Sequence, residues 1–276
     1  MRLTIVDVFA ESRWSGNQLA VVRDAQSLDG ASMQAIAREM NFSETTFVVS
    51  EGPERARVRI FTPGQELPFA GHPTVGTAWV LGRQRGQFTL DLDVGPVTVE
   101  FESPEGVAWM RPPEARFGPD LDRSRAAAVI GVAIDALHPD WPPTFVDLGP
   151  RFLFVPVRRR ADVSAAVLDL GVRARLLGAG LPADAVFVFA PEGYSADADF
   201  SARLFFDAGG VREDPATGSA NSALACYVRR YRAAPFRAVV EQGFEIQRPS
   251  RLYLDVGLAG YRVGGRVRLV AEGTLY

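Results

Sequence analysis

Three ionisable side chains have neighbours that could support proton transfer: Glu44, His72 and Asp214. Glu44 stands between an expected helix and an apolar strand, with Phe42 and Phe47 on either side. A carboxylate partly desolvated by two such rings holds a proton more tightly, which suits general acid–base catalysis. Periodicity alone predicts an exposed strand position for Glu44 instead. Both interpretations stand at this point.

The motif [HD]-P-x-x-G-[ST]-A occurs twice, beginning at His72 and at Asp214, 142 residues apart. Each copy is expected where a strand and loop lead into a helix, because proline is tolerated in a first helical turn. A helix N-terminus presents N–H groups and a partial positive charge, which suit a carboxylate or a developing oxyanion. Taken singly, Asp214 would be an N-cap and His72 a loop histidine bonded to the backbone. Two equivalent places favour a shared functional role.

Two further matches indicate an internal duplication. Arg59-Ile60-Phe61 corresponds to Arg203-Leu204-Phe205 at an offset of 144, and the strand from Glu44 can be laid on the strand from Asp184 at an offset of 140. These offsets are near half of the 276-residue length. They predict two copies of one lobe, with a substrate site where the lobes meet.

The surrounding sequence alternates short strands with single helices, which is typical of an α+β lobe. Helical apolar spacing predicts helices over residues 32–40, 74–81, 124–130 and 219–231. The proline-rich segment 111–119 is the candidate linker, so the expected domains are 1–115 and 116–276. Whether the last strand returns to the first lobe stays open.

Composition excludes several classes of protein. The net charge of −3 gives no basic surface for nucleic acid, and no apolar run approaches the ~20 residues of a membrane span. All 30 basic residues are arginine, which excludes lysine Schiff-base chemistry. One cysteine and two histidines are too few for a usual zinc site. The first residues lack the apolar core of a signal peptide. We therefore expect a cytoplasmic globular protein with no metal, no cofactor, and no nucleic acid or membrane partner.

Four strings, in this order, resemble the PhzF family of phenazine biosynthesis proteins. They are SGNQLAVV (15–22), MNFSETTFV (40–48), FTPGQELPFAGHPTVGTA (61–78) and EDPATGSANSALACYV (213–228). The resemblance covers nearly the whole chain. It implies the diaminopimelate epimerase-like fold, two pseudo-symmetric lobes that each wrap a mostly antiparallel sheet around a central helix. That expectation agrees with the duplication.

The resemblance also implies roles for individual residues. Glu44 would be the proton shuttle, and His72 and Asp214 would hold and polarise the substrate. Backbone and hydroxyl contacts would come from Gly71, Gly218 and Ser219. The implied activity is a cofactor-independent, metal-free isomerisation of a small amino or aromatic-like organic acid, performed by a homodimer.

Two other functions remain open. Epimerases and proline racemases of this fold use two thiols, which the single Cys226 excludes, but a carboxylate-based epimerase is compatible with these residues. A non-catalytic protein that binds or scaffolds a small ligand is the alternative from another class. The presence of all three proton-handling residues argues against it.

Overall fold

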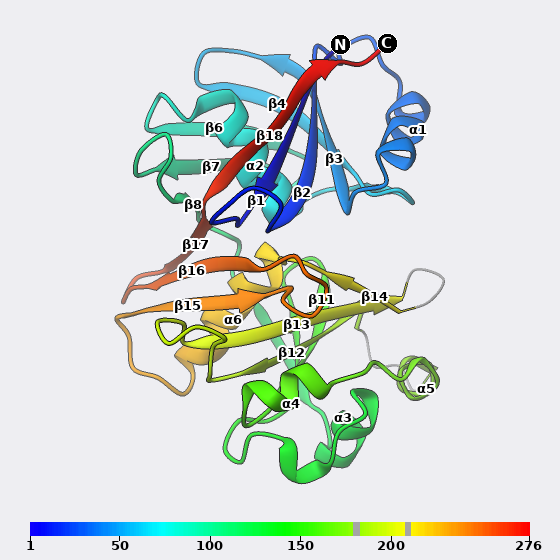
Figure 1. Ribbon diagram of the computed structural model, residues 1–276, viewed down its shortest axis with the longest axis vertical. Coiled ribbons are helices and arrows are strands. Elements are labelled where there is room, and N and C mark those ends of the chain that lie inside the picture. The colour runs from blue at the N-terminus through cyan, green and yellow to red at the C-terminus, as the bar shows by residue number, and fades with distance from the viewer. Residues whose placement is uncertain (179–182, 208–210) are drawn as a thin grey trace. The chain divides into compact units, whose positions relative to one another are not determined.

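The computed structural model describes residues 1–178, 183–207 and 211–276 (Figure 1). The chain forms two compact units. One comprises Met1–Pro112 together with Arg262–Tyr276, and the other comprises Pro113–Tyr261. The division therefore precedes the expected boundary at residue 115, and the C-terminal segment belongs to the first unit.

The expected linker is shorter than the proline-rich segment suggests. Residues 116–119 are part of strand β9 (Arg116–Asp120), which pairs antiparallel with β10 (Thr144–Asp147). Proline is compatible with such a strand at a sheet edge. Composition alone therefore overestimates the length of the linker.

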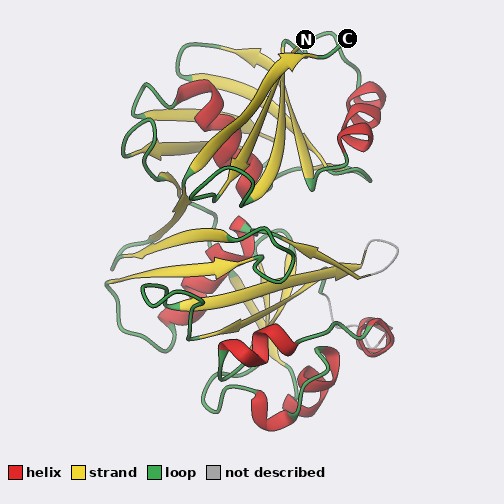
Figure 2. Cartoon of the chain, viewed as in Figure 1, coloured by secondary structure: helices red, strands yellow, loops and turns green. Residues whose placement is uncertain are grey.

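The first unit is a curved sheet around helix α2 (Gly71–Gly82), as Figure 2 shows. Its strands are β1 (Arg2–Val8), β2 (Asn17–Arg23), β3 (Glu44–Glu51), β4 (Arg55–Phe61), β5 (Glu66–Leu67), β6 (Gln87–Leu92), β7 (Gly95–Phe101), β8 (Ala108–Met110), β17 (Tyr261–Gly265) and β18 (Val267–Thr274). Ten of the twelve residues of α2 are buried, which is the pattern of a core helix. Helix α1 (Gly30–Met40) lies outside the sheet and completes a second small core with Phe47 and Phe61.

The second unit repeats this plan around helix α6 (Gly218–Arg229). Its strands are β9, β10, β11 (Arg151–Pro156), β12 (Ala185–Ala190), β13 (Phe200–Asp207), β14 (Val211–Asp214), β15 (Phe236–Gln242) and β16 (Ser250–Val256). Its peripheral helices are α3 (Arg123–Val129), the 3-10 helix Ile134–Ala136, α4 (Arg160–Ala165) and α5 (Leu170–Gly178). Ten of the twelve residues of α6 are buried, so α6 is the counterpart of α2.

The order of strand pairing is the same in both units. β2 runs parallel to β3, and β4 lies antiparallel to β3 and β5 and parallel to β6. In the second unit β11, β12, β13, β14 and β15 make the same four pairings in the same directions. The fold is therefore α+β with two pseudo-symmetric lobes of the diaminopimelate epimerase-like kind, which confirms the predicted fold class.

The strand register tests the predicted offsets. Phe47 faces Arg59 in the first unit, and Val188 faces Arg203 in the second, so the two arginines are equivalent at the predicted offset of 144. By the same register, residues of β3 are equivalent to residues of β12 at an offset of 141, so Ala185 is the counterpart of Glu44. The predicted pairing of Glu44 with Asp184 is wrong by one residue. Every residue of β12 is buried, so no polar alternation marks the register.

The predicted equivalence of His72 and Asp214 is also wrong. Helix α2 begins at Gly71 and α6 at Gly218, which makes His72 equivalent to Ser219. Asp214 faces Leu204 as Leu67 faces Ile60, so Leu67 is the counterpart of Asp214. The two copies of the motif share a proline, a glycine and small residues. Such residues suit the start of a helix in more than one alignment of the two copies, so the motif alone does not identify equivalent positions.

Candidate active site

Glu44 and His72 meet at the N-terminal end of α2. Glu44 opens β3, and His72 is the second residue of the helix, not a residue of the preceding loop. Glu44 Oε2 lies 3.4 Å from His72 Nε2, and the two side chains are 15% and 4% exposed. The exposed position that periodicity predicts for Glu44 is therefore wrong, because the edge of a short strand here adjoins a buried helix end.

Burial keeps His72 neutral. Desolvation lowers the pKa of His72 from 6.5 to about 3, and a hydrogen bond with the Gln18 backbone opposes this only in part. Asn17 Nδ2 lies 3.3 Å from His72 Nδ1. The pair is thus a carboxylate beside a neutral imidazole.

Close packing fixes the position of α2. The Thr46 and Thr77 hydroxyls hydrogen-bond at 2.8 Å and join the helix to β3. A Cβ added to Gly76 would lie 2.6 Å from Leu19 Cδ2 and 2.7 Å from Val8 Cγ2. Glycine is required here because the helix touches the sheet. The chemical groups at the helix start are therefore held by a rigid core.

A second polar cluster lies before α6. Asp214 ends β14, and the N-cap of α6 is Thr217, so the N-cap interpretation of Asp214 is wrong. The Thr217 hydroxyl donates to Asp214 Oδ2. Gly218 and Ser219 form the first turn of α6, and both are buried. This places a carboxylate beside the start of the central helix.

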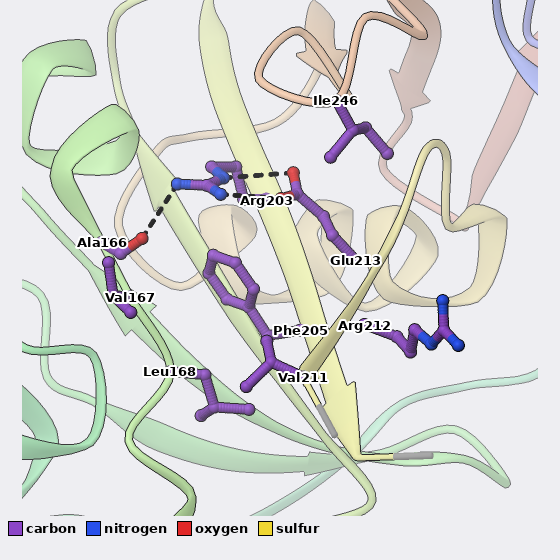
Figure 3. A pocket seen from close by; sticks show the side chains of 9 residues that line it. All are labelled: Ala166, Val167, Leu168, Arg203, Phe205, Val211, Arg212, Glu213 and Ile246. Carbon is purple, nitrogen blue, oxygen red and sulfur yellow. Dashed lines mark hydrogen bonds and ion pairs between the residues drawn. The ribbon is translucent and has the colours of Figure 1, made fainter. Parts of the chain in front are cut away.

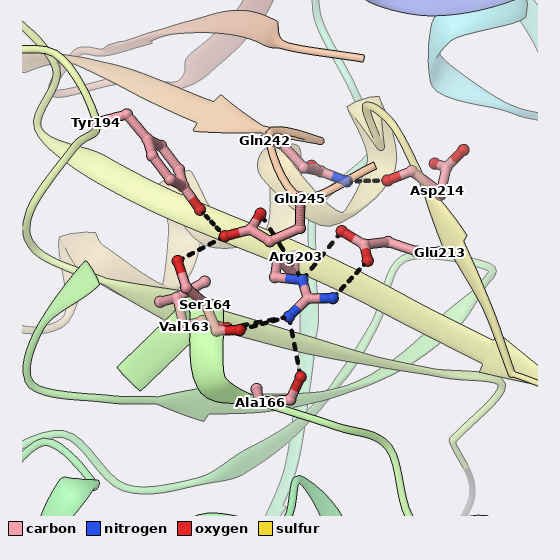
Figure 4. Close-up of polar contacts among 9 residues, drawn as sticks. All are labelled: Val163, Ser164, Ala166, Tyr194, Arg203, Glu213, Asp214, Gln242 and Glu245. Atoms are coloured by element: carbon pink, nitrogen blue, oxygen red, sulfur yellow. Dashed lines mark hydrogen bonds and ion pairs between the residues drawn. The ribbon is translucent and has the colours of Figure 1, made fainter. Parts of the chain in front are cut away.

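Gln242 connects β15 to this cluster, as Figure 4 shows for its bond to Asp214. Gln242 Nε2 donates to the Asp214 carbonyl oxygen at 2.8 Å and to Thr217 Oγ1 at 3.1 Å. Gln242 Oε1 accepts from Asn221 Nδ2 at 3.0 Å. The loop that leads into α6 is thus tied to the neighbouring strand.

The two central helices differ from α1 and α3 at their N-termini. Asp29 caps α1 and Asp122 caps α3 through side-chain hydrogen bonds. Among the residues that the structure describes, no side chain caps α2 or α6 in this way. Their N–H groups and helix dipoles suit an anionic ligand such as a carboxylate.

The predicted site residues thus form two half-sites. The first half-site is Glu44, Gly71 and His72 in the first unit, and the second half-site is Asp214, Gly218 and Ser219 in the second unit. Asn17, Thr217 and Gln242 also belong to these clusters, although they are not among the residues predicted from the sequence. Asn17 directly follows Gly16, whose φ of +70° marks a tight turn, and Thr217 lies inside the repeated motif, so both carried a signal. Gln242 carried none, because it ends a strand that also contains Arg237 and Glu241.

A hollow of about 460 Å³ lies elsewhere on the second unit (Figure 3). It is lined by Ala166, Val167, Leu168, Arg203, Phe205, Val211, Arg212, Glu213 and Ile246. None of the predicted site residues is in this set. Its buried charges already neutralise each other, because Arg203 donates to both carboxylate oxygens of Glu213 and to the Ala166 carbonyl. The half-sites therefore remain the candidate location of the chemistry.

These features define a class of protein: a duplicated diaminopimelate epimerase-like fold that carries acid–base side chains at the starts of its two central helices. Comparison with known proteins gives the family. The model for PhzC-PhzF, phenazine biosynthesis-like protein, matches residues 6–273. The trans-2,3-dihydro-3-hydroxyanthranilate isomerase of Pseudomonas aeruginosa is 37% identical over 100% of this chain and 99% of its own length. The chain belongs to this family of isomerases.

Solved structures agree. A predicted epimerase from Pseudomonas aeruginosa matches with a TM-score of 0.84 and 34% identity over 99% of this chain and 98% of its own. A PhzF-family phenazine biosynthesis protein from Bacillus anthracis matches with a TM-score of 0.87 and 26% identity over 100% and 99%. A probable proline racemase from Agrobacterium radiobacter shares the fold at 14% identity, with a TM-score of 0.64 over 100% and 92%.

Two further observations bear on the class. Cys226 lies within α6, and burial raises the pKa of its thiol, which disfavours the reactive thiolate. None of the helices traced through the described residues has both the length and the apolar character that crossing a bilayer demands.

Proposed function

We propose that this protein is a cofactor-independent isomerase that moves a proton on a small organic acid, with Glu44 as the group that removes and returns it. The observation that carries the proposal is the Glu44–His72 pair: a largely buried carboxylate 3.4 Å from the Nε2 atom of an imidazole. The low pKa of His72 keeps that imidazole neutral at physiological pH, so His72 itself adds no positive charge beside the carboxylate base.

The proposed step is a balanced proton shift. The Glu44 carboxylate takes a proton from an activated C–H bond of the substrate, and the released electron pair moves into a new double bond as the old one shifts. The Glu44 carboxyl group then returns a proton to the carbon at the far end of the shifted system. His72 orients the carboxylate and hydrogen-bonds the substrate, and no redox partner is needed.

The second half-site would bind the substrate. Asp214 accepts a hydrogen bond from an amino or hydroxyl group, and the N–H groups at Gly71, Gly218 and Ser219 hold the substrate carboxylate and the charge that develops during the shift. We propose that both half-sites act on one substrate molecule. This is supported by the chain's membership of the isomerase family and by the equivalent helix starts in the two units.

The family suggests the substrate class. A full-length relative at 37% identity is named for trans-2,3-dihydro-3-hydroxyanthranilate, a cyclic compound that carries a carboxylate, an amine and a hydroxyl. We propose a substrate of this kind. A carboxylate-based epimerase is the alternative, which the solved relative described as a predicted epimerase favours. In heavy water an epimerase inverts a stereocentre, whereas the proposed isomerase relocates a double bond.

The test is turnover of trans-2,3-dihydro-3-hydroxyanthranilate by purified wild-type protein and two variants. Glu44→Gln keeps the size of the side chain and removes the base, so kcat should fall by about 10²–10⁴-fold. Glu39→Gln makes the same change at an exposed position of α1 and should leave the rate unaltered. An unchanged kcat in Glu44→Gln would remove Glu44 from the mechanism.

A further inference from the structure

Gln242 is fully buried, and its amide group makes every hydrogen bond that it can. Nε2 donates to the Asp214 carbonyl oxygen at 2.8 Å and to Thr217 Oγ1 at 3.1 Å. Oε1 accepts from the Thr217 backbone N–H at 3.3 Å and from Asn221 Nδ2 at 3.0 Å. A carbonyl can only accept and a backbone N–H can only donate, so these two partners settle which end of the amide is nitrogen.

This arrangement also directs the Thr217 hydroxyl. Because Gln242 Nε2 donates to Thr217 Oγ1, the hydroxyl proton is free to point to Asp214 Oδ2, where the structure has a hydrogen bond. A chain of donors therefore runs from Gln242 through Thr217 to the Asp214 carboxylate. Such chains strengthen their members because each bond polarises the next.

The first unit shows that the fold itself does not need an amide at this place. β6 lies beside β4 as β15 lies beside β13, and the register makes Leu90 equivalent to Val240. Two residues further along the same face, Leu92 is therefore the counterpart of Gln242. Leu92 is 4% exposed and fills the position with apolar atoms. A buried amide costs free energy unless it is fully bonded, so its presence in one unit alone indicates a local task.

We propose that Gln242 is a positioning residue that, through Thr217, holds the Asp214 carboxylate ready for the substrate. This inference rests on the proposed function, in which Asp214 binds the substrate. Gln242 itself touches no reacting atom. It fixes the backbone on either side of the Asp214-to-Thr217 loop and sets the direction of the hydroxyl proton.

The first experiment removes each link of the chain separately. Gln242→Met keeps the length of the side chain without its polar atoms, and Thr217→Val keeps the shape without the hydroxyl. Each should lower kcat/KM for trans-2,3-dihydro-3-hydroxyanthranilate by about tenfold or more, mostly through a higher KM. Thr217→Val loses the hydrogen bond to the Asp214 carboxylate, and Gln242→Met loses the bonds that direct the Thr217 hydroxyl towards that carboxylate. Thr217→Ser retains the hydroxyl and should restore most of the activity.

Tyr194→Phe is the matched control. It removes the hydroxyl that donates to Glu245, within a polar cluster of the same unit that contains none of the site residues. It should alter thermal stability as much as the other variants do, without raising KM. A general loosening of the second unit would instead raise KM in all of them.

The pH dependence of kcat/KM in Gln242→Glu provides a second test. The introduced carboxyl group has the shape of the amide, and it can donate to Thr217 only while protonated. The ratio of its kcat/KM to that of the wild type should therefore rise as pH falls, whereas the ratio for Gln242→Met should stay low at every pH. A role in packing alone predicts no such difference between the two ratios.

The outcomes separate this inference from the proposed function. If Asp214→Ala loses activity while folded Gln242→Met and Thr217→Val keep wild-type kcat/KM, the inference is overturned and the proposed function stands. If the wild type does not turn the compound over, the proposed function fails, and crystal structures decide the inference. A displaced Asp214 carboxylate or Thr217 side chain in Gln242→Met then supports it, and unchanged positions overturn it.

Discussion

The two units share one scaffold but equip the starts of their central helices differently. His72 is the second residue of α2 and lies 3.4 Å from a carboxylate, whereas Ser219 is the second residue of α6. Behind the helices, Leu92 of the first unit is replaced by Gln242 in the second. The comparison teaches that a duplicated fold can keep its strand pairings while a few inward-facing residues differ. In the proposed function, these differences separate proton transfer from substrate binding.

One feature is retained in both units. Arg59 makes a bidentate ion pair with Glu66, and Arg203 makes one with Glu213. Each guanidinium lies over a phenylalanine ring, 5.1 Å from the centroid of Phe61 and 4.5 Å from that of Phe205. Each ion pair joins β4 or β13 to the short strand that leads towards a half-site. The difference in burial between the two ion pairs therefore offers a way to compare the two units.

The largest expected effect comes from breaking these pairs. Arg203 and Glu213 are 12% and 7% exposed, whereas Arg59 and Glu66 are 28% and 33% exposed. Glu213→Ala should lower the free energy of unfolding by about 2–4 kcal/mol, because it leaves a buried charge. Glu66→Ala should cost about 1 kcal/mol or less. Urea denaturation measures both, and equal costs would show that burial does not distinguish the units.

Acid should weaken the first unit through His72. The unfolded chain binds a proton near pH 6.5, but the native protein does so only near pH 3. Between these values the unfolded state holds more protons, so stability falls as pH decreases, by up to about 1.4 kcal/mol per pH unit. Hydrogen exchange in the first unit measures this. His72→Gln should flatten the slope, and His138→Gln, a change in the second unit, should not.

The second half-site should contribute to binding more than to folding. Asp214→Ala removes the proposed partner of the substrate amine or hydroxyl and should lower kcat/KM by about 10–100-fold. Steady-state kinetics with trans-2,3-dihydro-3-hydroxyanthranilate checks this. Asp135→Ala changes an exposed aspartate of the same unit and serves as the control. Wild-type kcat/KM in Asp214→Ala would leave the second half-site without a role.

The smallest effect concerns the close contact of α2 with its sheet. Gly76→Ala places a methyl group within 2.6–2.7 Å of the Leu19 and Val8 side chains and should cost about 1–2 kcal/mol of stability. Gly273→Ala meets nothing within 4 Å and should change stability by about 0.5 kcal/mol or less. Thermal unfolding compares the two. Equal melting temperatures would mean that the core around α2 yields freely.

Much of the fold was predictable because its signals are local. The helices α1, α2, α3 and α6 follow from apolar spacing, and the offset of 144 between Arg59 and Arg203 identifies the duplication. The alignment of the half-sites was not predictable in this way. The wholly apolar β12 gives no sign of its register. Proline and glycine suit more than one helix start, so the repeated motif aligns His72 with Asp214 in place of Ser219.

Within the site, Glu44, His72 and Asp214 could be chosen because carboxylates and imidazoles stand out against apolar strands. The supporting residues could not be chosen so easily. Gln242 is separated from Asp214 by the whole of α6, and only the parallel pairing of β13 with β15 brings their strands together. Its importance depends on hydrogen-bond geometry, which a linear sequence does not carry.

The most direct measurement follows a deuterium label placed on the substrate carbon that loses its proton. If Glu44 both removes and returns the proton, part of the deuterium should reappear at the new C–H bond of the same molecule in ordinary water at early conversion, and Glu44→Gln should abolish the transfer. Isomerisation without any transferred label, or with transfer undiminished in Glu44→Gln, would contradict the account.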